Sequence, residues 1–141
     1  MVAPAHRISR GSDFTRTLRS GVRVNTRDLV IHFLPVPVTP VGEADGLRTA
    51  DLASAGGPRL GLIVSKSVGN AVIRHRTARR LRAAFEQCLP HFPTTQLLVV
   101  IRARPQAAMS SSTALAEQLS GALTHRRLVA AIEPADRRVA P

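Results

Sequence analysis

The residues of this sequence with the clearest chemistry are arginines crowded into one short segment. Five of them fall within nine positions: Arg74, Arg76, Arg79, Arg80 and Arg82. Like charges at this spacing repel one another on a helix unless an anion compensates them. The planar guanidinium can bind phosphate oxygens through two parallel hydrogen bonds. The segment therefore predicts a phosphate-binding helix, and an ordinary solvated basic face is the alternative.

The charge of the whole chain points to the same kind of partner. Its 141 residues include 20 Lys and Arg against 9 Asp and Glu, a net charge of +11, and the isoelectric point is near 11.9. No acidic residue occurs from Leu52 through Phe85, whereas Arg59 and Lys66 add to the cations there. An isoelectric point above about 9 is typical of nucleic-acid-binding domains. We therefore expect a polyanionic partner.

The sequence shows no set of residues with the spacing that phosphodiester hydrolysis needs. Hydrolysis needs clustered carboxylates that hold metal ions, or paired histidines. The acids are scattered, and the five histidines show no ligand spacing. Gly56–Gly61 lacks the Lys and Ser or Thr of a phosphate-binding loop. The single cysteine, Cys88, excludes an internal disulfide, and we expect a buried thiol near a surface His91. The chain is predicted to carry no catalytic and no metal-binding residues.

Aromatic side chains are few, with four Phe and no Trp or Tyr. A sheet that stacks RNA bases on paired aromatic strands is therefore not expected. Phe14 and Phe33 are candidates for stacking on a single strand, and a plain core role is the alternative for each. Phe85 is expected in the core.

The length matches one domain, which we place over residues 1–133. Apolar runs such as Leu97–Ile101 stop at five residues, far short of the roughly 20 that a membrane span needs. Met1–Arg7 contains no apolar stretch, so no secretion signal is expected. These features predict a cytoplasmic protein.

Helix and strand patterns predict the order α-β-β-β-α-β-α, an α+β sandwich in which helices cover one small sheet. The first helix has Ser12 as its N-cap and ends at Gly21, and the last begins at Ser111 or Ser112. The other elements are strands near Val22–Val24, Leu29–Leu34, Arg59–Ser65 and Leu97–Arg102, and a long helix over Asn70–Leu89. Residues 41–58 are expected to form a flexible loop and residues 134–141 a disordered tail.

The long helix has an apolar stripe at Ala78, Leu81, Phe85 and Cys88, with spacings of three, four and three residues. The arginines spread over much of the remaining surface. Arg74 lies at the azimuth of the stripe but one turn earlier. We therefore expect Arg74 to point past the sheet edge into a cleft.

The segment from Arg59 to Arg82 closely resembles the signature of the bacterial ribonuclease P protein component. It joins a strand, a Ser65-Lys66 turn, Gly-Asn-Ala-Val and an Arg-x-Arg basic helix. Two weaker stretches agree in the same order, Arg7–Arg10 with Asp13-Phe14, and Leu98–Pro105. The resemblance covers about Arg7 to Arg127.

In that family an RNA is the catalyst. With magnesium, bound chiefly by the RNA, it hydrolyses precursor tRNA to release the 5′ leader, and the protein binds both the catalytic RNA and the leader. The resemblance implies a left-handed β-α-β crossover, and partners that include neither membrane nor DNA. It implies RNA contacts at Lys66, Asn70, Arg74, His75, Arg76, Arg79, Arg80 and Arg82. It implies a leader-binding cleft at Phe14, Leu18, His32 and Ser65.

The sequence departs from the family pattern at several positions. His75 replaces the middle Asn of Arg-Asn-Arg, and Ser67 and Ala78 stand where Lys is usual. Leu18 and His32 stand where aromatic residues are common, so stacking on the leader is expected to rest mainly on Phe14. Two alternatives are a structural RNA-binding protein of ribosomal type, which fits the charge and element order equally well, and a DNA-compacting protein.

Overall fold

A four-stranded mixed sheet is the centre of the fold. The computed structural model describes residues 7–8, 11–36, 57–93 and 96–139, with side chains as far as residue 132. The strand order is β1-β2-β4-β3. Both β1 with β2 and β2 with β4 are antiparallel, whereas β3 and β4 are parallel. The strands are β1 (Val22–Asn25), β2 (Leu29–Pro35), β3 (Arg59–Ile63) and β4 (Leu97–Ala103).

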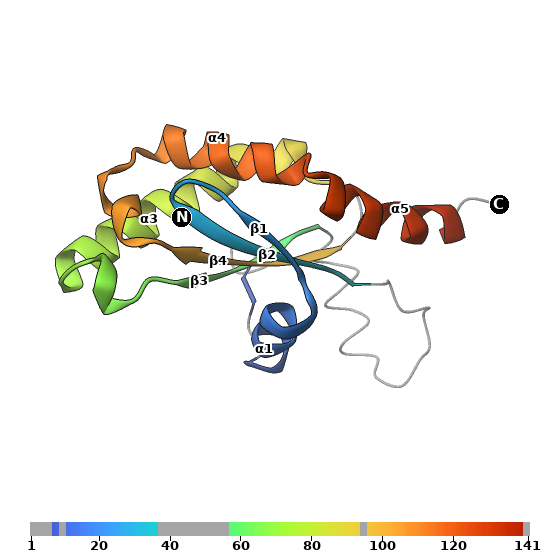
Figure 1. The fold of residues 1–141 in the computed structure, drawn as a ribbon, viewed down its shortest axis with the longest axis horizontal. Helices are drawn as coiled ribbons and strands as arrows, with labels where there is room; N and C mark the ends of the chain where they lie inside the picture. The colour runs from blue at the N-terminus through green and yellow to red at the C-terminus, as the bar shows by residue number, and fades with distance from the viewer. Residues whose placement is uncertain (1–6, 9–10, 37–56, 94–95, 140–141) are drawn as a thin grey trace.

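Helices cover both faces of this sheet (Figure 1). The helices α3 (Ala71–Cys88) and α4 (Ser112–Leu123) pack on one face, and α1 (Gly11–Ser20) lies on the other. A fourth helix, α5 (Arg126–Val139), contacts α4, β1 and β2. Short 3-10 turns connect these elements: η2 (Lys66–Val68), η3 (Leu89–His91) and η4 (Pro105–Met109).

Strand β4 shows why both faces need a cover. Leu97, Val99 and Ile101 belong to the main core, which also contains Phe33 and Phe85. Successive side chains of a strand point to opposite faces, so Leu98 and Val100 face α1, and both are buried. The run of consecutive apolar residues in β4 is thus explained by burial on two sides.

Two helix starts are set by side-chain caps. Asn70 Oδ1 accepts a hydrogen bond from the Ile73 backbone N–H at 3.0 Å, and Ser111 Oγ accepts one from Ala114 N–H at 3.1 Å. Each cap satisfies a backbone donor that the first helical turn leaves unpaired. The prediction that Ser111 or Ser112 caps the last predicted helix is confirmed. The Ser12 cap is wrong, because α1 already includes Gly11.

The predicted α+β class and order of elements are confirmed from α1 to α4. The helix α5 was not predicted, and it covers most of the segment expected to be a disordered tail, 134–141. It forms because Leu128 and Ile132, four residues apart, are buried against the sheet side of the core. Of the predicted loop 41–58, residues 41–56 lie outside the described residues. The left-handed course of the β3-α3-β4 connection stays an expectation.

A buried carboxylate ties the hairpin turn to the helical layer. Asp28 is only 2% exposed, and its Oδ2 accepts hydrogen bonds from Ser110 Oγ and Gln118 Nε2, both at 2.6 Å. The Arg27 guanidinium lies 3.3 Å from the same oxygen. Burial alone raises the pKa of Asp28, but the hydrogen bonds and the arginine outweigh it, so the pKa is lower than the usual 3.8. The ionised form therefore stabilises the fold.

Asp28→Asn should lower the free energy of unfolding at pH 7 by about 1–3 kcal/mol, because a neutral amide oxygen accepts weaker hydrogen bonds than a carboxylate and loses the ion pair with Arg27. A depressed carboxyl pKa contributes stability that is complete above the unfolded value and is lost as pH falls through the folded value. Urea unfolding from pH 7 to pH 2 should therefore show a difference between variant and wild type that shrinks below about pH 4. A constant difference over this range would contradict the assignment.

Candidate nucleic-acid interface

One side of α3 faces a groove beside the edge strand. Arg74, His75 and Arg82 lie on this side, together with two alanines. They enclose a hollow of about 290 Å³ against Leu62 and Val64, at the end of β3. Positions three, four and seven residues apart share one side of a helix. The prediction that Arg74 points into a cleft at the sheet edge is confirmed.

A second set of cations on α3 lies away from this groove. Arg79 is exposed and Arg76 is half-buried, and neither lines the hollow. The Nε atoms of Arg74 and Arg76 are shielded by protein and have no hydrogen-bond partner in the part of the chain that the structure describes. Exposed Arg79 and half-buried Arg76 place guanidinium groups outside the groove, and such groups bind phosphate oxygens. The outer side of α3 is therefore suited to phosphates.

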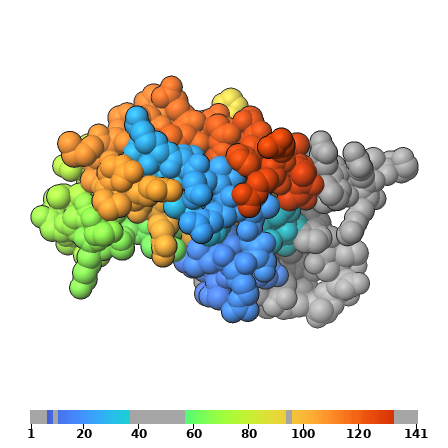
Figure 2. Space-filling model, in the orientation of Figure 1, coloured from blue at the N-terminus to red at the C-terminus, as the bar shows by residue number. Residues whose placement is uncertain are grey.

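Arg80 is held differently from its neighbours. Its Nη1 donates to the backbone carbonyl oxygens of Ala108 at 3.3 Å and Ser110 at 3.2 Å. These carbonyls belong to η4 and the residue after it, and η4 lies beside the start of α3 at one end of the molecule (Figure 2). Ser110 also donates to Asp28. Arg80 thus connects α3 with the polar network of the hairpin turn.

The remaining predicted RNA contacts, Lys66 and Asn70, lie in the connection between β3 and α3. Lys66 is exposed in η2, and the Asn70 side chain is used as the cap of α3. Gly69 has a φ of +155°, and a Cβ there would lie 2.8 Å from the Ile73 side chain. Only glycine avoids this contact, which explains the Gly-Asn pair. Ser65, predicted in the leader cleft, is exposed, and its Oγ lies 2.8 Å from Ser67 Oγ.

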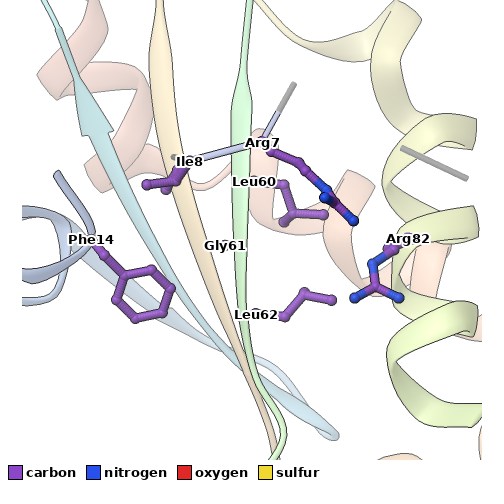
Figure 3. Close-up of a pocket in the computed structure, with 7 residues that line it drawn as sticks. All are labelled: Arg7, Ile8, Phe14, Leu60, Gly61, Leu62 and Arg82. Carbon is purple, nitrogen blue, oxygen red and sulfur yellow. The ribbon is translucent and has the colours of Figure 1, made fainter. Parts of the chain in front are cut away.

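Phe14 of α1 packs directly on the backbone of β3. A Cβ at Gly61 would lie 2.6 Å from Phe14 Cε2, so the ring occupies the space that glycine leaves. The N-terminal segment joins the outer edge of the same strand, where Ile8 N–H donates to the Leu60 carbonyl at 3.0 Å. In Figure 3, Phe14 and Ile8 lie on one side of β3, and Arg7 and Arg82 lie on the other.

These residues border a hollow of about 280 Å³ that extends across the strand at Gly61. Its lining is Arg7, Ile8, Phe14, Leu60, Gly61, Leu62 and Arg82. Sequence analysis missed Arg7 and Gly61 in this site. A glycine inside a strand often marks a close approach of another group, and that signal was available at Gly61.

His32 lies in the middle of the sheet face that α1 partly covers. Its neighbours in register are Arg23 on β1 and Val100 on β4. Its Nδ1 is buried and has no partner among the described residues. Burial first, and then the charges of Arg23 and Arg102, lower the pKa of His32 below 6.5. The imidazole is therefore mainly neutral at pH 7.

The structure brings together only part of the predicted leader cleft. Phe14 lines the hollow, whereas Leu18, His32 and Ser65 are outside its lining. Phe33 is fully buried in the core, so its prediction as a stacking candidate is wrong.

The predicted burial of Phe85 and Cys88 in α3 is confirmed, whereas Ala78 of the same apolar stripe lines the groove. Phe85 is fully buried. Cys88 is also buried, and its Sγ lies 3.2 Å from the Ala116 carbonyl. Burial raises the pKa of this thiol. His91 is exposed, as expected for a surface histidine.

No group of three or more His, Cys, Asp or Glu side chains among the described residues could hold a metal ion. No helix in this part of the chain has the length and the apolar character that a membrane crossing requires.

Comparison with known proteins supports the resemblance over most of the chain. The family model Ribonuclease P matches residues 2–127. The ribonuclease P protein component of Rhodococcus opacus is 44% identical over 132 residues, covering 94% of this chain and 97% of that protein. The component of Corynebacterium diphtheriae is 41% identical over 123 residues, covering 87% and 94%.

Solved structures agree with this result. The RNase P protein of Staphylococcus aureus has a TM-score of 0.58 at 25% identity, over 82% of this chain and 90% of that chain. The RNase P protein of Thermotoga maritima has a TM-score of 0.62 over 83% and 94%, and at 18% identity it supports the fold alone. The mixed sheet, the basic helix and the sequence similarity all agree. The chain therefore belongs to the family of the bacterial ribonuclease P protein component, the protein subunit of the endoribonuclease that matures the 5′ end of precursor tRNA.

Proposed function

We propose that this chain binds the catalytic RNA with the outer side of α3 and the 5′ leader of precursor tRNA in the cleft beside α1. Membership of the family implies association with the RNase P RNA. The observation that supports two separate surfaces is the placement of the α3 cations, some of which face a groove while others face outward. A ribosomal role is set aside by family membership.

The surface for the catalytic RNA consists of exposed or half-exposed donors around α3. We assign it Lys66, Arg76 and Arg79, with Asn70 acting through the start of the helix. His75 is exposed and also lines the groove, so we place it at the border of the two surfaces. Cations that meet phosphates release counterions, which gives affinity without sequence specificity. Arg80 has a positioning role in this proposal, because it already donates to two carbonyls of the protein.

The surface for the leader centres on Phe14. Its ring is half-buried and rests on the backbone at Gly61, with Arg7 and Arg82 across the strand. An aromatic ring beside cations suits a single strand, which offers flat bases and a charged backbone. Half-buried His32, whose pKa is lowered by burial, lies on the adjoining sheet face. Leu18 and Ser65 remain proposed members of this cleft.

Magnesium is proposed to act on the RNA and not on this chain. The family implies the ion, but the carboxylates described in the structure do not fit it. Asp28 already accepts from Ser110, Gln118 and Arg27, and no cluster of three ligand side chains lies near it. We therefore assign no catalytic step to a residue of the chain. The substrate, precursor tRNA, places the proposed activity in the cytoplasm.

Reconstitution tests the proposed function. At low magnesium, the protein added to the catalytic RNA should increase 5′ cleavage of precursor tRNA, whereas purified protein freed of carried RNA should cleave nothing. Binding to ribosomal RNA and to duplex DNA at matched salt provides the comparison. Cleavage by the protein alone would overturn the proposed division between protein and RNA.

Arg79 and Arg80 form a matched pair of neighbouring variants. Arg79→Gln should flatten the slope of log affinity for the catalytic RNA against log salt by about 0.7–0.9, the value for one phosphate, and leave the Tm unchanged. Arg80→Gln should leave that slope unchanged and lower the free energy of unfolding by about 1–3 kcal/mol, because two carbonyls lose a charged donor. Equal slopes for Arg79→Gln and wild type would show that Arg79 contacts no phosphate and is an ordinary solvated residue.

Phe14 is tested together with the glycine beneath it. Phe14→Ala should weaken the binding of precursor tRNA to the holoenzyme by about 1–3 kcal/mol, the value of one stacked base, and leave mature tRNA unaffected because it has no leader. Gly61→Ala should have the same selective effect, because the new Cβ displaces the ring. Gly121→Ala is the control, since a Cβ there meets no atom within 4 Å.

The alternative role of Phe14 in the core predicts a different result. Phe14→Ala would then lower the Tm strongly and weaken precursor and mature tRNA equally. Thermal melting measured beside the two affinities separates the two roles.

A further inference from the structure

The hollow beside Phe14 adjoins the groove of α3. Both hollows include Leu62 of β3 and Arg82 of α3 in their linings. Arg82 therefore stands between them, and a ligand that leaves Phe14 across Gly61 meets the groove next. The outward cations Arg76 and Arg79 line neither hollow.

The groove has the chemistry of a nucleotide subsite. Its apolar lining comes from Leu62, Val64, Ala71 and Ala78, and its polar lining from Arg74, His75 and Arg82. No acidic residue is part of the lining. A nucleotide joins a flat, weakly polar base to an anionic phosphate, which matches both parts. The volume of about 290 Å³ is at the small end of ligand pockets, which suits one base.

Small side chains keep this space open. Ala71 and Ala78 are seven residues apart and therefore lie on one side of α3, two turns from each other. A lysine, which the family resemblance leads one to expect at position 78, would project a long chain from this side. With alanine at position 78, the charged side chain is absent and the hollow stays open.

We propose that the hollow between α3 and β3 receives the base of a second leader nucleotide, next to the one on Phe14, while Arg74 and Arg82 bind its phosphates. The inference rests on the proposed leader site. The leader is favoured over the catalytic RNA because the hollow adjoins the Phe14 site through the shared residues Leu62 and Arg82, whereas Arg76 and Arg79 are not part of its lining.

Filling the hollow tests the inference. Ala78→Leu adds an apolar side chain without a change of charge, and Ala83→Leu is the matched control on the same helix, at a position that lines neither hollow. In the holoenzyme, Ala78→Leu should weaken precursor tRNA by about tenfold relative to mature tRNA. Ala83→Leu should leave this ratio unchanged.

Precursors with one abasic leader nucleotide identify the base concerned. With wild-type protein, two neighbouring abasic positions should each weaken binding. One of these positions should lose its effect in Ala78→Leu, and the other in Phe14→Ala. This scan with wild-type protein remains informative even if Ala78→Leu fails to fold, because a single sensitive position would overturn the second subsite.

Three other outcomes also decide the question. An unchanged ratio for a folded Ala78→Leu would show that the hollow is not used. Equal weakening of precursor and mature tRNA, or weaker binding of the catalytic RNA alone, would assign the hollow to the catalytic RNA and overturn the inference. If neither Phe14→Ala nor any abasic position has an effect, the proposed leader site itself is wrong.

Discussion

The burial of β4 on both faces is the constraint on which this fold depends. Five consecutive apolar residues, Leu97–Ile101, cannot be covered by one layer of helices, because alternate side chains point to opposite faces. The helices α3 and α4 cover one face. The short helix α1 covers the other face only in part, and His32 remains partly exposed there. The cleft beside α1 is thus a consequence of covering a two-sided sheet with one short helix.

Gly61 on the edge strand and two alanines on α3 leave open the space of the two hollows. Gly61 allows the Phe14 ring to rest on the backbone of β3, so the aromatic surface is held by van der Waals contact with a rigid element. Ala71 and Ala78 keep the opposite side of that strand open toward α3. Arg82 borders both spaces. Absence of side-chain volume at a few positions therefore shapes the site as much as the cations do.

Sequence reasoning succeeded where the deciding forces are local and failed where partners are distant along the chain. Helical periodicity alone placed Arg74 at a cleft, and a single serine placed the start of α4. The helix α5 was missed because Leu128 and Ile132 find their partners on the other elements of the core. The direction of Arg80 was missed because its acceptors, Ala108 and Ser110, belong to η4. The hollow at Gly61 depends on α1 and β3, which are far apart in the sequence.

The polar network around Asp28 explains how so basic a helix keeps its place. Self-repulsion among the α3 cations opposes folding, and a net charge of +11 leaves few acids to offset it. The Arg80 guanidinium instead donates hydrogen bonds to two backbone carbonyls of the protein. One of these belongs to Ser110, whose hydroxyl donates to Asp28 in the β1–β2 turn. In the proposed complex, RNA phosphates that bind the remaining cations reduce this repulsion, because folded α3 holds these cations in two fixed sets, one at the groove and one facing outward. RNA binding and folding of α3 would then stabilise each other.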